Sequence, residues 1–470
     1  MRRAISIFNT IMICLLAGEI SLAQDDSPAL ICGIKMGELT SDSMVVWARL
    51  TSGAINPENW PDKHGPQIPG MAGEFRVVAE PYDDQNKLRP QDAVQTDWIP
   101  VTEASDYCGQ VQLSGLEPET RYRIQTTTRN QNGLGASSVG TITTPGKADS
   151  VHPVRFAVVT CQGYHRRDAA EAGHKIYQSM LELDEVSGTS KPEFLVHTGD
   201  IVYYDRANPV ATNVELARHH WHRMFSLTNQ KRFHSQVPTY FMKDDHDTLF
   251  DDCWPGFTNP KTGELTFEKG LELFREQVPM GEKTYRTFSW GQDLQIWLVE
   301  GRDYRSPNRM DDGPEKTIWG KEQIDWLKRT VAESNASFKI LISPTPIVGP
   351  DRKTKNDNHA NEGFKHEGDW ARQFLAEQKM ISICGDRHWQ YVSDDPESGL
   401  REVACGPSSD AHAGGFNEKQ RSEHHKFLRI AGGFLTVSVD RENGKPFAIF
   451  RHHDVDGNVV NEFQFESSIE

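Results

Sequence analysis

The sequence predicts two folded units, an all-β sandwich followed by an α/β domain, and three observations lead to this expectation. With 470 residues the chain is too long for a single ordinary hydrophobic core. Between residues 25 and 146, short alternating strands follow one another without helical patterns. After a turn-rich polar linker at residues 143–150, apolar strands alternate with helical patterns, which is typical of an α/β domain with one or two sheets and helices outside.

The first residues have the pattern of a secretory signal peptide. Arg2 and Arg3 precede an apolar run at residues 11–17, and Ser21-Leu22-Ala23 provides the small residues of a cleavage site. The run is shorter than the roughly 20 residues that a membrane span needs, and no later stretch replaces it. We therefore expect residues 1–23 to be removed and the mature chain to be exported, periplasmic or extracellular, without a transmembrane anchor. The alternative is an uncleaved anchor.

We expect the first unit to span residues 24–148. Its alternating apolar patterns predict strands near residues 43–50, 74–79, 109–113 and 122–128. Strands at this density are typical of a β-sandwich. Leu116 to Tyr122 resembles the turn and tyrosine corner of fibronectin type III or immunoglobulin-like modules. For Trp47 and Tyr122 we therefore expect core packing.

We expect the second unit to span residues 149–470, with helices near residues 169–183, 214–225, 320–334 and 369–377. Four of its apolar strands break abruptly into residues that bind metals. Because ligands bind at the carboxyl edge of α/β sheets, these four segments predict the walls of one metal site. They lie at residues 154–164, 194–205, 237–247 and 379–389.

The single residues differ in how strongly they indicate a metal. Asp200 ends a buried strand, where a carboxylate must be paired or metal-bound. Asp244 and Asp245 are adjacent carboxylates that would repel each other without a cation. Cys161 alone is more often an inert buried thiol, and Asp386 could belong to a salt-bridged turn. Four such segments in one domain together favour a metal site.

The ligand types indicate two different metals. A thiolate, a phenolate, a carboxylate and an imidazole suit a high-charge transition metal such as ferric iron. The carboxylates of Asp200, Asp245 and Asp386 are hard oxygen donors that suit calcium, magnesium or manganese. Asp200 would bridge the two cations. Such a pair binds a phosphate and activates water for in-line attack.

These segments resemble the PhoD-type alkaline phosphatases, a branch of the calcineurin-like metallophosphoesterases, over nearly the whole mature chain. Cys161 stands where the family has its opening metal motif, and residues 199–203, 244–247 and 385–388 follow the patterns Gly-Asp-x-x-Tyr, Asp-Asp-His-Glu and Gly-Asp-x-His. The resemblance implies an αββα domain, a β-sandwich flanked by helices, preceded by a small all-β sandwich. It also implies an iron and calcium centre, other divalent cations being possible, with iron bound by Cys161, Asp200, Tyr203 and His388 and calcium by Asp200, Asp245 and Asp386.

The resemblance also implies catalytic roles. His246 would stabilise the developing charge or the leaving group, the alternative being a structural histidine. Arg302 would contact the phosphate, although Glu300 and Gly301 differ from the family's Asp-Thr-Arg-x-x-Arg segment. Asp247 replaces a glutamate of the family, and we expect this shorter carboxylate to change how His246 is oriented.

The charge of the chain limits its partners. A net charge of −16 disfavours nucleic acid and anionic membranes as large partners. We therefore expect an exported metal-dependent phosphatase whose substrates are small phosphate mono- or diesters. The alternatives are a secreted binding protein whose metallo-domain has lost turnover, and a metallohydrolase of non-phosphate esters. Since no ligand of the pattern is visibly lost, an enzyme is favoured. The sequence does not indicate an oligomeric state.

Overall fold

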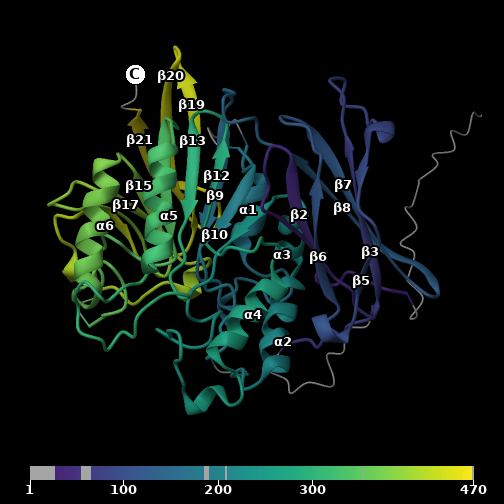
Figure 1. The fold of residues 1–470 in the computed structure, drawn as a ribbon, viewed down its shortest axis with the longest axis horizontal. Coiled ribbons are helices and arrows are strands. Elements are labelled where there is room, and N and C mark those ends of the chain that lie inside the picture. The colour runs from purple at the N-terminus through teal and green to yellow at the C-terminus, as the bar shows by residue number, and fades with distance from the viewer. Residues whose placement is uncertain (1–26, 54–64, 185–189, 207–208, 353, 468–470) are drawn as a thin grey trace, which may run out of the picture.

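The computed structural model describes residues 27–53, 65–184, 190–206, 209–352 and 354–467, so the expected signal peptide at residues 1–23 lies outside the described residues. An all-β unit at the amino end is followed by two larger sheets with helices around them (Figure 1). The predicted order of an all-β unit and an α/β unit is confirmed. Among the helices that can be described, none has the length and apolar character to cross a membrane.

The all-β unit consists of two antiparallel sheets. A three-stranded sheet has the order β1-β2-β6, and a five-stranded sheet has the order β4-β3-β7-β8, with β5 paired to β3. The four strands predicted from the sequence are present as β2, β3, β6 and β7. The strands are β1 (Ile34–Gly37), β2 (Ser43–Arg49), β3 (Gly73–Pro81), β4 (Val94–Gln95), β5 (Ile99–Val101), β6 (Cys108–Ser114), β7 (Arg121–Asn130) and β8 (Gly133–Thr143).

Tyr122 forms the tyrosine corner that its sequence context predicts. Its ring is buried, and its hydroxyl accepts a hydrogen bond from the backbone N–H of Glu117 at 2.8 Å. Trp47 is buried as well, but its indole N–H donates to the carbonyl of Glu276 in the second unit at 2.7 Å. Core packing is thus confirmed for both aromatic residues, and Trp47 also joins the two units.

The second unit contains two mixed sheets. The six-stranded sheet has the order β11-β10-β9-β19-β20-β21, and the seven-stranded sheet has the order β12-β13-β14-β15-β17-β16-β18. In chain order the strands are β9 (Val154–Val159), β10 (Phe194–His197), β11 (Thr239–Phe241), β12 (Arg286–Trp290), β13 (Leu294–Leu298), β14 (Phe338–Ser343), β15 (Ile381–Cys384), β16 (Gln390–Asp394), β17 (Arg401–Cys405), β18 (His425–Arg429), β19 (Phe434–Glu442), β20 (Lys445–His453) and β21 (Val459–Glu466).

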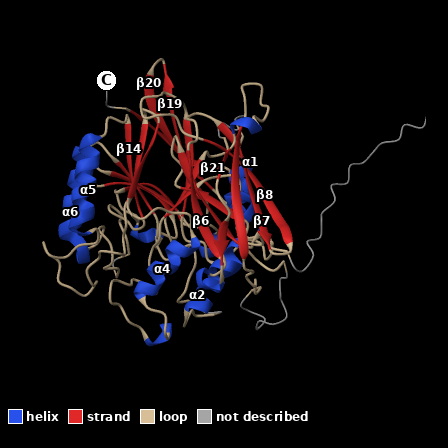
Figure 2. Ribbon diagram, turned by 45° about the vertical axis from the view of Figure 1, so that its right-hand side comes forward, coloured by secondary structure: helices blue, strands red, loops and turns tan. Residues whose placement is uncertain are grey.

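The two sheets pack face to face with helices on their outer faces, so the predicted αββα architecture is confirmed. Phe156 and Val196 of one sheet share a buried core with Ile296 and Ile340 of the other. The helices α1 and α3 cover the six-stranded sheet, α5 and α6 cover the seven-stranded sheet, and α2 packs with α4 against the loop after β10 (Figures 1 and 2). The helices are α1 (Lys175–Glu182), α2 (Val214–Phe225), α3 (Thr228–His234), α4 (Phe267–Gln277), α5 (Gly320–Glu333) and α6 (Lys365–Glu377).

The predicted helix at residues 169–183 is shorter in the structure. Gly173 has a φ of 96°, and it exchanges two backbone hydrogen bonds with Ala169 at 3.0 and 3.1 Å. This turn prevents helix formation before Lys175. The helices α3 and α4 were not predicted, although the side chain of Thr266 caps the start of α4 by accepting from the N–H of Lys269 at 3.2 Å.

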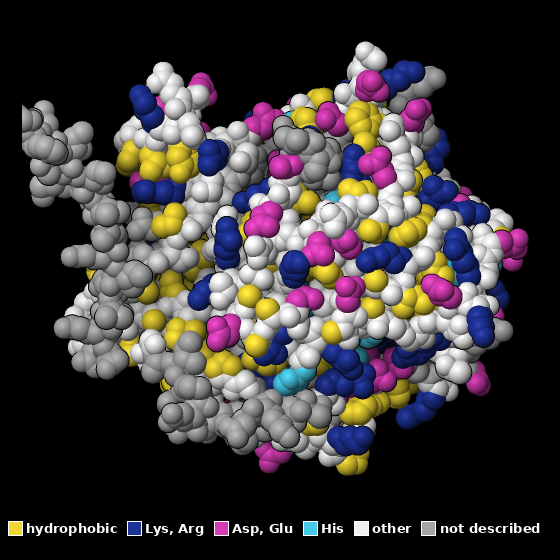
Figure 3. Space-filling model, turned by 180° about the vertical axis from the view of Figure 1, so that it is seen from behind, with side chains coloured by type: hydrophobic (Ala, Val, Ile, Leu, Met, Phe, Trp, Pro, Cys, Tyr) yellow, Lys and Arg dark blue, Asp and Glu magenta, His cyan; other side chains and the backbone are white. Residues whose placement is uncertain are grey.

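The surface shows no extended patch of one charge on the face drawn in Figure 3. Basic and acidic side chains are interspersed there, and apolar groups lie between them.

Candidate metal centre

The candidate centre lies where strands of both large sheets end. Cys161 follows β9, Asp200 follows β10 and Asp386 follows β15. All three have a left-handed backbone, with φ values of 52°, 56° and 59°, which is uncommon for residues other than glycine. Backbone strain of this kind is concentrated at functional sites, because the surrounding structure must hold it in place. The three turns place the ligand atoms of Cys161 and Asp386 each within 4.8 Å of one of Asp200.

Two glycines allow these turns to approach one another. Gly199 has a φ of 112°, and a Cβ atom there would lie 2.6 Å from the backbone nitrogen of Asp244. A Cβ atom at Gly385 would lie 2.3 Å from the Thr198 hydroxyl and 2.7 Å from the carbonyl oxygen of Pro344. A side chain at either position would push the strand ends apart. The Gly-Asp order of both motifs is therefore required by packing.

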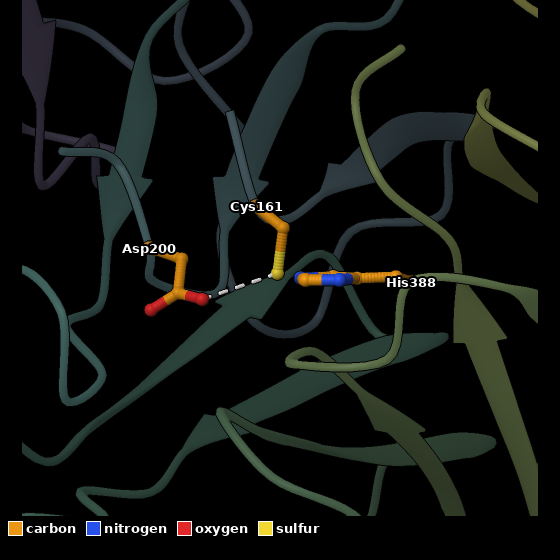
Figure 4. Close-up of side chains that lie close together, drawn as sticks. All are labelled: Cys161, Asp200 and His388. Atoms are coloured by element: carbon orange, nitrogen blue, oxygen red, sulfur yellow. Dashed lines mark hydrogen bonds between the residues drawn. The ribbon is translucent and has the colours of Figure 1, made fainter. Parts of the chain in front are cut away.

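One group of donors consists of Cys161, Asp200, Tyr203 and His388. The thiol of Cys161 donates to Oδ2 of Asp200 at 3.3 Å, and the hydroxyl of Tyr203 donates to the same oxygen at 3.0 Å. Ligand atoms of Cys161, Asp200 and His388 lie within 4.8 Å of one another (Figure 4). The structure thus brings together the four residues that the family resemblance implies as ligands of iron.

The protonation of this group fits a cation site. Burial raises the pKa of Asp200 to about 7 and raises the pKa values of Cys161 and Tyr203 well above their ordinary ranges. A bound cation would favour the ionised forms of all three. Oδ1 of Asp200 is buried and has no hydrogen-bond donor among the described residues. Since a buried carboxylate oxygen needs a partner, this atom is suited to bind a cation.

A second group of donors consists of carboxylates. Ligand atoms of Asp200, Asp244 and Asp386 lie within 4.8 Å of one another, and those of Asp200, Asp245 and His246 form a similar group. Asp386 is half-buried and also forms an ion pair with its neighbour Arg387. Asp200 and Asp386, which the sequence predicted for a hard cation, therefore lie together with Asp244, whereas the predicted Asp245 lies near Asp200 in the group that contains His246.

Asp244 and Asp245 differ in the partners that they already have. Oδ2 of Asp245 accepts from the backbone N–H of Asp252 at 2.5 Å. Oδ1 of Asp244 is bound by Arg302, but its Oδ2 is buried and lacks a hydrogen-bond partner within the described part of the chain. Sequence reasoning chose Asp245 as the ligand. The structure places both carboxylates close to Asp200 and leaves an oxygen of Asp244 unoccupied by protein donors.

Arg302 lies in the centre but is not exposed to a substrate. Its side chain is 1% exposed, and its Nε and Nη2 atoms lie 2.6 and 2.5 Å from Oδ1 of Asp244. Its Nη1 atom donates to the carbonyl of Cys253 at 3.2 Å. In this arrangement the guanidinium group positions Asp244, whereas the family resemblance implies a contact with phosphate.

His246 is oriented by a residue that sequence reasoning missed. Its Nδ1 atom lies 2.8 Å from Oδ1 of Asp205, and its ring centroid lies 4.4 Å from that of Tyr203. Burial lowers the pKa of His246, but Asp245, Asp200 and Asp205 outweigh this and raise it well above the usual range. Cations bound to those carboxylates would lower it again. The ring is thus held in place and can carry a proton.

Asp247 does not take the role expected from its motif. Its Oδ2 atom accepts from the backbone N–H of Ile201 at 3.0 Å, and its Oδ1 atom accepts from that of Asp244 at 2.7 Å. The carboxylate therefore ties the loop after β10 to the loop after β11. Asp205, and not Asp247, fixes the orientation of His246.

His412 also belongs to the centre and was missed by sequence reasoning. Its Nδ1 atom lies 2.8 Å from the carbonyl oxygen of Cys161, and its ring lies 4.3 Å from that of His388 and 5.4 Å from that of Tyr203. Burial lowers the pKa of His412 to about 4, so it is neutral at pH 7. It lies in a short 3-10 turn, with small residues on both sides. This run of small residues is the sequence feature that could have indicated that His412 belongs to the centre.

Comparison with known proteins identifies the family. The family model of the PhoD-like phosphatase matches residues 156–432, and that of the PhoD-like phosphatase N-terminal domain matches residues 17–146. A solved structure of PhoD superposes with a TM-score of 0.72 at 17% identity, covering 94% of this chain and 91% of that chain. Purple acid phosphatase PPD1 from yellow lupin (Lupinus luteus) seeds gives a TM-score of 0.63 at 12% identity, covering 94% and 74%. At these identities the two structures show a shared fold.

A relative of known sequence is alkaline phosphatase D of Bacillus subtilis (strain 168). It is 24% identical over 412 residues, which cover 77% of this chain and 65% of that protein. The chain thus spans just under two thirds of the length of this relative. The family implies metal ions, which agrees with the buried donor groups around Asp200. Since one family model covers more than half of the chain, this protein belongs to the PhoD-like phosphatase family.

Proposed function

We propose that this chain hydrolyses phosphate mono- or diesters at a centre of two metal ions. The burial and the contacts of Asp200 are the observation that supports this proposal. Its carboxylate is 1% exposed, contacts Cys161 and Tyr203, lies within 4.8 Å of Asp244 and Asp386, and keeps one oxygen without a hydrogen-bond partner among the described residues. A carboxylate between two donor groups suits a bridging ligand. Membership of the family supports phosphate esters as substrates.

The chemistry of the donors supports two different cations. We assign ferric iron to Cys161, Asp200, Tyr203 and His388, because thiolate, phenolate and imidazole ligands favour a transition metal. We assign calcium, or another hard divalent cation, to Asp200, Asp386 and Asp245. We add Asp244 as a further ligand, because its ligand atom lies within 4.8 Å of those of Asp200 and Asp386. When bound, two such cations would neutralise the charge of the phosphate and acidify a water molecule.

The residues of the chain provide orientation and a proton. His246 is 5% exposed and is fixed by Asp205 on one side and by the ring of Tyr203 on the other. We assign it the role of donating a proton to the departing oxygen. Arg302 holds Asp244 in place through its guanidinium group.

We also propose that the mature protein acts outside the cytoplasm, in a periplasm or in the extracellular space. The signal-peptide pattern of residues 1–23 supports this location. Comparing the amino-terminal residue of protein purified from culture medium or periplasm with the full sequence tests the proposal. Recovery of the intact amino terminus in the cytoplasm would contradict it.

The function is tested by metal analysis beside activity. We expect the purified protein to contain iron and calcium, and to hydrolyse 4-nitrophenyl phosphate or bis(4-nitrophenyl) phosphate. His246→Ala should keep both metals while kcat falls by about 10²- to 10⁴-fold. Asp325→Ala, which removes an exposed carboxylate on α5, is the matched control and should keep full activity. A preparation loaded with metal that hydrolyses neither ester would refute the proposed function.

A further inference from the structure

A cavity of about 480 Å³ lies beside the candidate metal centre, and its charge is opposite to that of the whole protein. Tyr203 and His388 belong to its wall, so it is continuous with the centre. Arg166, Arg206 and Arg223 also line it, whereas the described lining contains no Asp or Glu. Because the chain has a net charge of −16, a wall with three arginines and no carboxylate is a local exception.

Two of these arginines, Arg166 and Arg206, are exposed. Arg166 is exposed, donates from Nη1 to the carbonyl of Ala411 at 3.0 Å, and forms no ion pair with any residue that the structure describes. The side chain of Arg206 is 60% exposed, and its closest carboxylates, Asp251 and Asp205, are 3.6 and 3.9 Å away. Both guanidinium groups therefore retain N–H donors for a ligand.

The third arginine lies deeper. Arg223 is 2% exposed, its Nη2 atom lies 3.0 Å from Nδ1 of His220, and its guanidinium carbon lies 4.4 Å from the centre of the Tyr164 ring. Burial lowers its pKa to about 10, so it remains a cation at neutral pH. Val202 and Met224 add apolar surface to the same wall. The cavity thus combines fixed positive charge with room for carbon atoms.

The volume of the cavity exceeds what the reacting phosphate needs. Pockets of about 300–1,000 Å³ hold small organic ligands, and guanidinium groups bind carboxylates and phosphates through paired hydrogen bonds. We propose that this cavity receives the organic part of the phosphate ester, and that Arg166 and Arg223 select esters whose organic part carries a second anionic group, a carboxylate or a phosphate. This inference rests on the proposed function, because the reacting phosphate must lie at the metal centre.

Three aryl esters test the inference. In 4-carboxyphenyl phosphate the organic part carries an anion, 4-carbamoylphenyl phosphate has the same shape without the charge, and phenyl phosphate has neither group. A charge-assisted hydrogen bond contributes about tenfold, so we expect kcat/KM of the wild-type enzyme to be about tenfold higher for the carboxylate than for the amide. Arg166→Gln should lower this ratio at least about threefold, and the added substitution Arg223→Gln should bring it close to one.

The ratio is insensitive to general damage, because loss of metal or of folded protein affects both esters equally. Arg329→Gln removes an exposed arginine of α5 and is the matched control, which should leave the ratio unchanged. If the double variant fails to fold, the exposed Arg166→Gln variant alone decides. Wild-type enzyme that hydrolyses all three esters with a ratio near one would overturn this inference and leave the proposed function intact. Wild-type enzyme that hydrolyses none of them would overturn both.

Discussion

The substitution Arg302→Gln distinguishes a residue that positions a metal ligand from one that binds substrate phosphate. In the structure the guanidinium group is 1% exposed and both its Nε and Nη2 atoms bind one oxygen of Asp244. Glutamine keeps an amide donor but removes the positive charge. Asp244, itself 1% exposed, would then be a buried carboxylate without its cation.

The expected cost follows from this burial. Removing one member of a buried ion pair costs about 3–5 kcal/mol, because the remaining charge is left uncompensated. We therefore expect the metal-free Arg302→Gln protein to unfold at a clearly lower urea concentration than the wild type. Arg286→Gln is a matched control, because Arg286 is 8% exposed and binds the carboxylate of Glu38 at 2.8 and 3.1 Å. It should lose stability of the same order and keep normal metal content.

The assay combines urea unfolding, metal content and steady-state kinetics with 4-nitrophenyl phosphate. If Arg302 positions Asp244, the variant should lose metal, kcat should fall in proportion, KM of the loaded fraction should stay within about twofold, and Arg302→Lys should restore part of the metal content. A variant with normal stability and full metal content, but with KM raised about tenfold or more, would refute this reasoning and show that Arg302 binds phosphate.

Three further predictions follow. In urea unfolding, Asp106→Ala should destabilise the protein by about 3–5 kcal/mol, since it removes the carboxylate that pairs with Arg49, which is 2% exposed. As a control, Asp92→Ala removes one member of an exposed ion pair and should cost under about 1 kcal/mol. Burial lowers the pKa of His452 to about 3, against about 6.5 in an unfolded chain, so the free energy of unfolding should fall as pH decreases from about 6.5. His452→Gln should reduce the slope of the unfolding free energy against pH. An unchanged slope would contradict the lowered pKa of His452. Tyr203→Phe should shift or bleach a visible charge-transfer band, and a colourless active enzyme that contains only zinc would refute ferric iron.

The sequence predicted that Asp200 and Asp386 belong to the centre, because a carboxylate at the end of a buried strand must be paired with a cation or bound to a metal. Gly199-Asp200 and Gly385-Asp386 stop two apolar runs, and packing at the glycines explains why the order is fixed. The motif did not distinguish Asp244 from Asp245. Asp244 accepts from Arg302, a residue far away in the sequence that no local pattern connects to it, and Asp245 accepts from the backbone N–H of Asp252.

Other parts of the centre could not be predicted because their positions depend on long-range contacts. His412 lies in a short turn that no strand or helix pattern indicates, and it reaches the centre through the carbonyl of Cys161. Asp205 is close to His246 because the loops after β10 and β11 run together, with the N–H of Tyr204 donating to the carbonyl of His246 at 3.0 Å. The sequence also did not predict which sheet contains β15, because an apolar pattern indicates a buried strand but not the strands beside it.

Two of the departures from the family's motifs, Glu300 and Asp247, have a physical explanation. Glu300 stands where the family has an aspartate, and its carboxylate accepts from the backbone N–H of Arg302 at 2.7 Å and from Nζ of Lys243 at 2.6 Å. The longer side chain thus still fixes Arg302, which in turn fixes Asp244. Asp247 is shorter than the family's glutamate and binds the backbone of both loops directly. Because both side chains are carboxylates that bind the backbone around the centre, neither of these two departures argues against a working metal centre.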